Sequence, residues 1–312
     1  MKFCYYVTTA CFLLFVSCKK EIEVKNPSFE VHTSSNTLKV GDVITFNIES
    51  NADIITFYSG LRGDDYDFKD TERVYPATTS LSFISAMYAG NNSNCAALKY
   101  STDFNGNYDP ASIRQATWTD ITDRFHIPGI NGSSAVFENS GEKDISDLFP
   151  DINTPIYFAW FFTTQANSNR TRFQVQAFQL KGVVANEPDL TSVNYDFASC
   201  GFKMVKGEGF LIQDDATTTP RVTASAIIWD GVYATTSFKE GWAVSNPLYA
   251  ATEVNLGRDY GTAIKSVLDV PLTEHQFKYE VPGTYTVTFV AANKNVYDAK
   301  EVVKQIKLNI EP

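Results

Sequence analysis

The strongest constraint on the fold is that apolar and polar residues alternate, one by one, near both ends of the chain. In DVITFNI, the side chains of Ile44, Phe46 and Ile48 fall on one face, and polar residues separate them. A period of two is typical of half-buried β-strands. The pattern recurs in GTYTVTFVA and QIKLNI, whose apolar positions are Tyr285, Val287, Phe289, Ile306, Leu308 and Ile310. No segment has a long, well-capped helical period, so the sequence predicts an all-β protein.

Length and charge narrow the class of protein further. The 312 residues suit roughly two domains, because domains commonly contain about 100–200 residues. Phe and Tyr dominate the aromatic content of 14%, which favours strands over helices. The formal net charge of −10 argues against nucleic acid as a partner, because its phosphates would be repelled. The same charge also keeps a protein soluble, which is the simpler explanation.

The first 17 residues have the features of a targeting segment that is not part of the folded protein. Lys2 provides a positive charge, and the run from Phe3 to Ser17 carries no charge. That run is about 15 residues long, short of the roughly 20 that a membrane-spanning helix needs. We therefore interpret residues 1–17 as a secretory signal peptide.

The segment FVSC, which ends at Cys18, resembles the lipobox of bacterial lipoproteins. The resemblance implies cleavage before Cys18 and attachment of diacylglycerol to its thiol, with residues 18–25 as a charged tether. Two or three acyl chains hold a protein on a membrane far more firmly than one. The alternative is an ordinary signal peptide with incidental cysteines.

Only two cysteines would remain besides Cys18 after the signal is removed. Cys95 and Cys200 could form a disulfide in an oxidising compartment, but their spacing leaves the pairing open. The chain has three histidines and no CxxC pair, so neither a zinc site nor a thiol mechanism is expected.

The two ends of the chain resemble parts of one known domain type. KVGDVITFNIES (residues 39–50) and FKYEVPGTYTVTFVAANKN (residues 277–295) resemble the opening and closing strands of a PKD-type, immunoglobulin-like sandwich. The resemblance implies one sandwich formed by residues 26–75 and 269–312, which together have the length of a single such domain. The middle of the chain would then be inserted into it. A separate small sandwich at each end is the alternative.

Residues 76–268 have a different signature. Segments such as ATWTDITDRF, YFAWFFTT and GWAVSNPL resemble the jelly-roll modules of secreted bacterial proteins. Fold class is therefore expected to be an immunoglobulin/PKD-like β-sandwich combined with a jelly-roll β-sandwich. With the lipobox, the arrangement resembles surface lipoproteins of Bacteroidetes encoded beside glycan-uptake systems. That resemblance implies an outer-membrane anchor, a polysaccharide or oligosaccharide ligand, and an uptake complex as partner.

A glycan binder needs exposed aromatic rings that stack on sugars, with polar groups beside them. Trp229 and Tyr233 flank an Asp-Gly turn at a strand end, and Tyr58 and Tyr66 flank an acidic turn. These four residues are the predicted glycan-binding positions, although packing at a strand end also explains them. The remaining tryptophans, Trp118, Trp160 and Trp242, lie inside strand-like runs and are expected in the core.

One further cluster has the composition of a cation site. STDFNGNYDP places oxygen-bearing side chains at Asp103, Asn105, Asn107 and Asp109, and such ligands hold Ca²⁺. The glycine falls at the fourth position and Arg114 stands at the twelfth, so the segment is not an EF-hand. Structural calcium is therefore one hypothesis, and ordinary turn formation is the other.

The sequence gives no reason to expect catalysis. It contains no GxSxG, HExxH or phosphate-binding glycine loop, and we predict no catalytic residue or other cofactor. The leading hypothesis is a non-catalytic, lipid-anchored protein that binds extracellular glycan for uptake. The alternatives are an adhesive or structural surface protein and, less favoured, a glycan-degrading enzyme, since a glycosidase needs only two suitably placed carboxylates.

Overall fold

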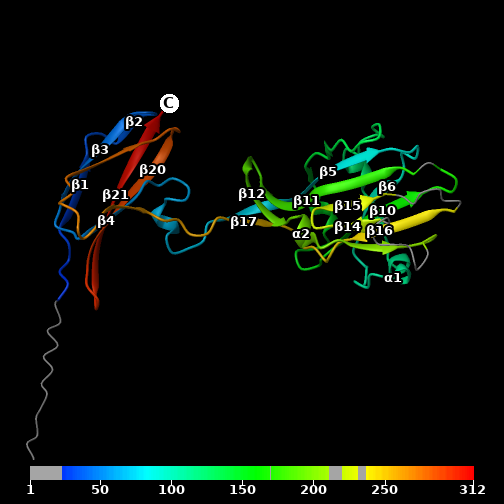
Figure 1. Cartoon of the computed structure of the whole chain (residues 1–312). Helices are drawn as coiled ribbons and strands as arrows, with labels where there is room; N and C mark the ends of the chain where they lie inside the picture. Colours follow the sequence, from blue (N-terminus) through cyan, green and yellow to red (C-terminus); the bar gives the residue numbers. More distant parts are fainter. Residues whose placement is uncertain (1–22, 169, 211–219, 231–236) are drawn as a thin grey trace, which may run out of the picture. The chain divides into compact units, whose positions relative to one another are not determined.

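The computed structural model describes residues 23–168, 170–210, 220–230 and 237–312 (Figure 1). The all-β prediction is confirmed, because the α-helices of the described residues are only six and four residues long. They are α1 (Pro110–Gln115) and α2 (Phe197–Cys200), and three 3₁₀ turns, η1 (Tyr66–Phe68), η2 (Thr122–Arg124) and η3 (Ser146–Leu148), accompany them. None of these described helices is long and apolar enough to cross a membrane.

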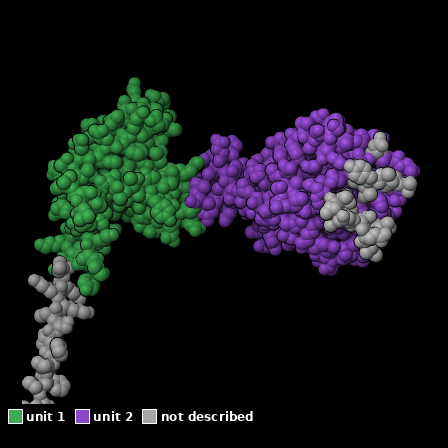
Figure 2. Space-filling model, in the orientation of Figure 1, with its two compact units in different colours: residues 1–73, 257–312 green, residues 74–256 purple. Residues whose placement is uncertain are grey.

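The chain forms two compact units (Figure 2). Unit 1 comprises residues 1–73 and 257–312, and unit 2 comprises residues 74–256. The boundaries predicted from the sequence fall after residues 75 and 268, whereas the units divide after residues 73 and 256.

Unit 1 is a sandwich of two β-sheets. The smaller sheet has the order β1 (Phe29–Thr33), β3 (Val43–Ser50), β19 (Glu274–Lys278). The larger has the order β18 (Thr262–Lys265), β4 (Ile54–Tyr58), β20 (Gly283–Lys294), β21 (Ala299–Glu311), β2 (Thr37–Lys39). The β2–β21 pair is parallel and the other pairs are antiparallel. Both sheets therefore contain strands from both ends of the chain.

The alternating residues form the core of unit 1, as predicted. Ile44, Phe46 and Ile48 are buried, and Val287, Phe289, Leu308 and Ile310 are buried with them in the same cluster, while Tyr285 and Ile306 pack against its edge. The rings of Phe46 and Phe289 lie 5.2 Å apart with edge-to-face geometry. Burying each such side chain contributes about 1.5–3 kcal/mol, so these strands are held chiefly by apolar packing.

Unit 2 is a second, larger sandwich. Its five-stranded sheet has the order β13 (Lys203–Lys206), β16 (Lys239–Val244), β10 (Tyr157–Thr164), β6 (Ala96–Ser101), β7 (Thr119–Asp120). The eight-stranded sheet has the main order β14 (Arg221–Val222), β15 (Ala226–Trp229), β11 (Arg172–Val184), β5 (Val74–Tyr88), β17 (Glu253–Asn255). In that sheet β12 (Glu187–Tyr195) pairs with β11, and β8 (Glu138–Asn139) and β9 (Lys143–Asp144) pair with β5.

The core of unit 2 is rich in aromatic rings from both sheets. Trp160 of β10 is fully buried, and it contacts Phe83 of β5 edge-to-face with ring centroids 5.1 Å apart. Cys95 and Cys200 lie in the same core as free thiols, which settles the pairing that the sequence left open. Burial raises the pKa of each thiol to about 12, so neither is a reactive thiolate near neutral pH.

Candidate functional site

The outer face of the five-stranded sheet of unit 2 carries aromatic side chains that the sandwich core does not use. Successive residues of a strand point to opposite faces, so Phe161 of β10 points away from the core that holds Trp160. Trp242 of β16 is the cross-strand partner of Phe161. Their ring centroids are 4.5 Å apart, and the rings are tilted by 44°. Both side chains are partly exposed.

A third ring joins them from the loop between β6 and β7. In this loop α1 buries Ile113, and Ile113 and Phe104 form a small apolar cluster with Ala159 and Val244 of the outer face. Trp118 packs against this cluster and donates an indole N–H bond of 2.9 Å to the backbone oxygen of Ile113. We call Trp118, Trp242 and Phe161 the aromatic row.

The row is continuous and not flat. Ring centroids of Trp118 and Trp242 lie 5.4 Å apart, and the two rings are tilted by 42°. Trp118 is partly exposed, like the other two members. A partly exposed ring offers an apolar face for the C–H groups of a sugar, while its buried part holds it rigidly in place.

Two ion pairs flank the aromatic row. The Lys99 ammonium lies 3.1 Å from a carboxylate oxygen of Asp120 and 5.7 Å from the ring centroid of Phe161. On the other side, the guanidinium of Arg114 lies 3.6 Å from Glu240. Each pair is neutral, so these four side chains add hydrogen-bonding groups beside the row without adding net charge.

A groove of about 470 Å³ opens at the β6–β7 side of the row. Ala97, the cross-strand partner of Phe161, and Asp120, the partner of Lys99, both line it. Exposed Asp123 adds a second carboxylate to the same groove. Acceptors beside an apolar platform are the groups that a glycan site requires.

The structure does not support the glycan-stacking role predicted for Trp229. Its side chain is fully buried, and its ring stacks on Phe162 with centroids 5.3 Å apart. Gly241 provides the space, because a Cβ atom there would lie 2.6 Å from the indole ring. A ring with no exposed face cannot stack on a sugar. Tyr233, predicted beside it, lies outside the described residues, as does Cys18.

The structure brings together Tyr58 and Tyr66, the other two residues predicted to bind glycan. Tyr58 at the end of β4 and Tyr66 of η1 meet edge-to-face, with ring centroids 5.4 Å apart, and both are partly exposed. The Lys69 ammonium lies 5.2 Å from the Tyr66 ring. This tyrosine pair is a second aromatic surface of the chain, and it belongs to unit 1.

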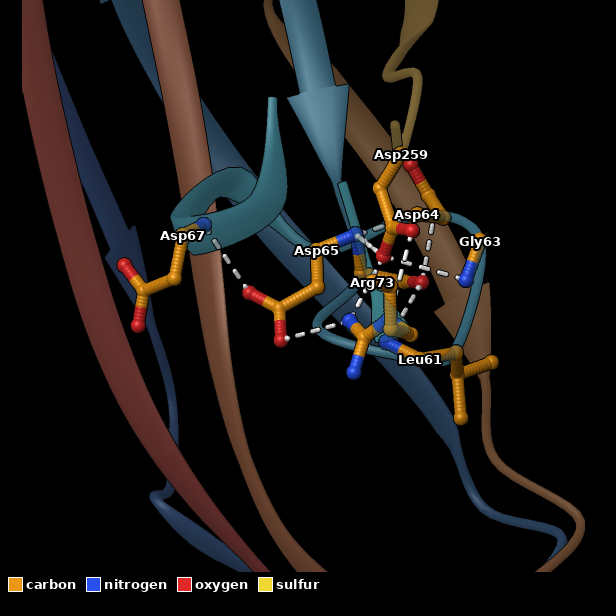
Figure 3. Close-up of polar contacts among 8 residues, drawn as sticks. Leu61, Gly63, Asp64, Asp65, Asp67, Arg73 and Asp259 are labelled. Carbon is orange, nitrogen blue, oxygen red and sulfur yellow. Dashed lines mark hydrogen bonds and ion pairs between the residues drawn. The ribbon is translucent and has the colours of Figure 1, made fainter. Parts of the chain in front are cut away.

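The acidic turn between these tyrosines is a structural network (Figure 3). Buried Asp259 accepts backbone N–H bonds of 3.1 Å from Gly63 and Asp65, and Arg73 lies 2.6 Å from its carboxylate. Arg73 also pairs with the Asp65 carboxylate at 3.2 Å. These contacts join the segment that leaves unit 1 at Arg73 to the segment that returns at residue 257.

Two carboxyls in this network are shifted in opposite directions. Burial opposes ionisation of Asp259, but the hydrogen bonds and charge of Arg73 outweigh it, and the pKa of Asp259 lies below its usual value. Burial dominates at Asp64 and raises its pKa, despite hydrogen bonds from Ser59. The carboxyl groups of Asp64, Asp65 and Asp259 are therefore already bound by hydrogen-bond donors of the protein itself.

The four residues of the calcium hypothesis make local turn bonds. Asp109 caps α1 by accepting bonds from the backbone N–H groups of Ala111 and Ser112, at 2.9 and 3.0 Å. Asp103 accepts from Thr117, and Asn105 accepts from the backbone N–H of Asn107, whose own carbonyl accepts from Asp109. Across the described residues, no group of three or more His, Cys, Asp or Glu is arranged to hold a metal ion.

The sequence-based expectation of core positions is confirmed for Trp160 and holds only in part for Trp118 and Trp242, which are partly buried against a smaller apolar cluster on the outer face. The alternation in the strand YFAWFFTT places Trp160 and Phe161 on opposite faces of the sheet, so the sequence alone distinguishes the inward ring from the outward one. Nothing in that segment alone says that Trp242 stands beside Phe161, because the pairing joins residues about 80 positions apart.

Comparison with known proteins identifies a family without a known role. The model of the domain of unknown function DUF5017 matches residues 17–200, which is more than half of the chain, and the protein belongs to this family. The matched range contains Trp118 and Phe161 and ends before Trp242. No curated protein and no solved structure matches the chain significantly.

Proposed function

We propose that this protein binds extracellular glycan without altering it, by stacking sugar rings on the aromatic row of unit 2. The observation that carries the proposal is the partial exposure of Trp118, Trp242 and Phe161 on the outer face of the sheet. The inter-sheet core is complete without these rings. Large aromatic side chains left partly in water, and bordered by balanced polar groups, are typical of a binding surface.

The charges favour a neutral glycan. The Lys99–Asp120 and Arg114–Glu240 pairs are each neutral, and the Asp123 carboxylate in the adjoining groove would repel an anionic glycan. The protein as a whole has a formal net charge of −10, which repels a polyanionic glycan within about one screening length of its surface. Hydroxyl groups of a neutral sugar can accept from the cations and donate to the carboxylates of both pairs.

The tilt between the rings restricts which glycan conformations can stack on the aromatic row. Consecutive rings are inclined by 42° and 44°, so a straight, flat chain can lie face-on against only one of them. A chain that turns between successive sugars can face two. We therefore expect a turning polysaccharide to bind better than a flat, ribbon-like β-1,4-glucan.

The proposed location is the outer membrane, with acyl chains on Cys18 and the charged tether of residues 18–25 holding the two units outside it. The lipobox-like FVSC motif supports this part of the proposal. An uptake complex in the same membrane would receive the captured glycan. The resemblance to glycan-uptake lipoproteins of Bacteroidetes is the reason for naming that partner.

Affinity electrophoresis through gels containing single polysaccharides tests the proposal. We expect retardation of the full-length protein by at least one neutral, turning glycan, and loss of that retardation in Trp242→Leu, which keeps apolar bulk without an aromatic face. Tyr66→Leu in unit 1 is the matched variant and should remain retarded. Retardation lost only in Tyr66→Leu would place the site in unit 1.

The alternative functions give different results in the same assays. Adherence to cells with no polysaccharide retained in any gel would favour an adhesive surface protein. Release of reducing sugar from a retained glycan would establish a degrading enzyme.

A further inference from the structure

The most exposed apolar side chains of the described residues gather in two loops at one end of unit 1. Their exposed fractions are 96% for Leu268, 93% for Val296, 81% for Val270 and 81% for Tyr297, and no other large apolar side chain of the described chain reaches these values. Val267, at 58%, adjoins Leu268 in the same loop. Such side chains are costly to leave in water, so their clustering needs an explanation.

Both loops hold these side chains outward with internal hydrogen bonds. Asp269 accepts from the backbone N–H and the hydroxyl of Ser266 at 2.6 and 2.8 Å, which closes the turn around Leu268. Asn295 accepts from the backbone N–H groups of Tyr297 and Asp298 at 2.8 and 2.9 Å. The apolar tips are therefore built into ordered turns.

A chain of hydrogen bonds places both loops beside the point where the tether enters unit 1. Lys265, next to the first loop, donates to the backbone oxygen of Asp53 at 3.1 Å. The backbone N–H of Asp53 donates to the Asn293 side chain at 2.9 Å, and Asn293 donates to the backbone oxygen of Lys25 at 3.1 Å. Figure 1 shows the β20–β21 hairpin ending on the side from which the chain enters β1.

We propose that the two loops, residues 266–270 and 295–298, insert into the interface of the bilayer to which the protein is anchored. The inference rests on the proposed acylation of Cys18. Seven Cα–Cα steps separate Cys18 from Lys25 and span at most about 24 Å, so an acyl anchor keeps this end of unit 1 close to the lipid. Leu and Val side chains enter the boundary of the acyl chains, and Tyr297 suits the headgroup level.

The partner is the lipid surface and the attraction is apolar. Lys25, Lys265, Lys294 and Lys300 lie in or beside these segments, and Glu23, Asp269, Asp298 and Glu301 offset them in charge. Electrostatic attraction to anionic headgroups is therefore not the main force, and insertion should persist at high salt.

Site-specific fluorescence in vesicles tests this inference. Leu268→Cys and Tyr297→Cys would each be labelled with a polarity-sensitive thiol probe on the full-length, acylated protein. The native thiols Cys95 and Cys200 are buried and do not compete for the probe. The protein would then be reconstituted in phosphatidylethanolamine–phosphatidylglycerol vesicles that contain a spin-labelled lipid as quencher.

Val281→Cys is the matched control. Val281 is also exposed, at 61%, but it precedes Gly283 at the opposite end of β20, about 40 Å away along the strand. We expect a blue shift and strong quenching of the probes at 268 and 297, unchanged by salt, and neither effect at 281.

The outcomes separate this inference from the anchor. Acylated protein that floats with vesicles while all three probes stay unquenched would overturn the inference and leave the anchor standing. Protein that carries no acyl chain by mass spectrometry, and does not float, would overturn both.

Discussion

The two units use their aromatic residues differently. In unit 1, Phe46, Phe57 and Phe289 all lie between the sheets, and the partly exposed Tyr58–Tyr66 pair lies at the acidic turn. In unit 2, one strand supplies both a core ring, Trp160, and an outward ring, Phe161. This contrast shows that unit 2 carries aromatic rings on its outer face that do not belong to the core between its sheets. They are therefore the surface on which a binding function is best sought.

The units also differ in how they are closed. Unit 2 is one continuous segment held by a large apolar core. Unit 1 is formed by two segments, and the Arg73–Asp259 pair joins them where the chain leaves and returns (Figure 3). We therefore expect the buried Arg73–Asp259 pair to contribute more to the stability of unit 1 than an exposed ion pair contributes to that of unit 2.

The largest expected effect separates the inner and outer faces of unit 2. Trp229→Ala removes a fully buried ring and should cost about 3–5 kcal/mol of the free energy of unfolding. Trp242→Leu removes a partly exposed ring and should cost clearly less. Urea denaturation followed by circular dichroism measures both. Equal losses would mean that the outer rings are part of the fold, and the contrast between the faces would fail.

The next effect concerns the closure of unit 1. Arg73→Met leaves the Asp259 carboxylate buried and unpaired, which should cost about 3 kcal/mol of the free energy of unfolding. Arg124→Met is the control, because Arg124 forms a more exposed pair with Asp147 in unit 2, and it should cost less than about 1 kcal/mol. Losses of the same size in the two variants would contradict the structural role of the network.

The same network predicts a dependence on pH. The folded-state pKa of Asp259 lies below its usual value, so its stabilisation is complete above the ordinary aspartate pKa of about 3.9. That stabilisation is lost as the pH falls through the folded-state value. Unfolding curves at a series of pH values should be less steeply pH-dependent in acid for Asp259→Asn than for the natural chain.

Asp64 should change the free energy of unfolding with pH in the opposite direction. Its pKa is raised by burial, so its favourable contribution is present at low pH and is lost as the pH rises through the folded-state value. Asp64→Asn should therefore gain stability relative to the natural chain as the pH rises. A loss that grows with pH would show that its hydrogen bonds from Ser59 dominate.

A smaller effect concerns the thiols of unit 2. Burial raises the pKa of Cys95 and Cys200 to about 12, so thiolate is scarce at neutral pH. Ellman's reagent should react with neither in the native protein and with both after unfolding in the absence of reductant. Two thiols that appear only after reduction would show a disulfide, contrary to the structure.

The smallest expected effect tests the calcium hypothesis. Asp103, Asn105 and Asp109 already accept backbone N–H bonds, so removing Ca²⁺ with a chelator should leave the melting temperature unchanged. A fall of several degrees, restored by added Ca²⁺, would revive calcium as a structural ligand.

The sequence predicts the strands of the sandwiches well because alternation is a local property. The inward positions of β3, β20 and β21 follow from a period of two alone. The position of Trp229 does not, because its burial depends on the space above Gly241 in a strand of the opposite sheet. A tryptophan beside an Asp-Gly turn therefore gave a false signal of exposure.

The aromatic row could be predicted only in part for the same reason. Alternation in β10 separates Phe161 from Trp160, but long-range pairing brings Trp242 beside it, and the α1 loop adds Trp118. Exposed Leu268 and Tyr297 are visible as apolar residues in turns, yet their common position depends on the Asp53–Asn293–Lys25 contacts. Contacts between distant segments are the information that a local pattern lacks.

The most direct test of the central claim is calorimetric titration of one retained, neutral polysaccharide into the natural chain and into Trp242→Leu, at equal folded fraction. We expect measurable heat of binding for the natural chain and none for the variant, because stacking on the aromatic row supplies the affinity. Undiminished binding by Trp242→Leu would contradict the claim that the outer face of unit 2 is the glycan-binding surface.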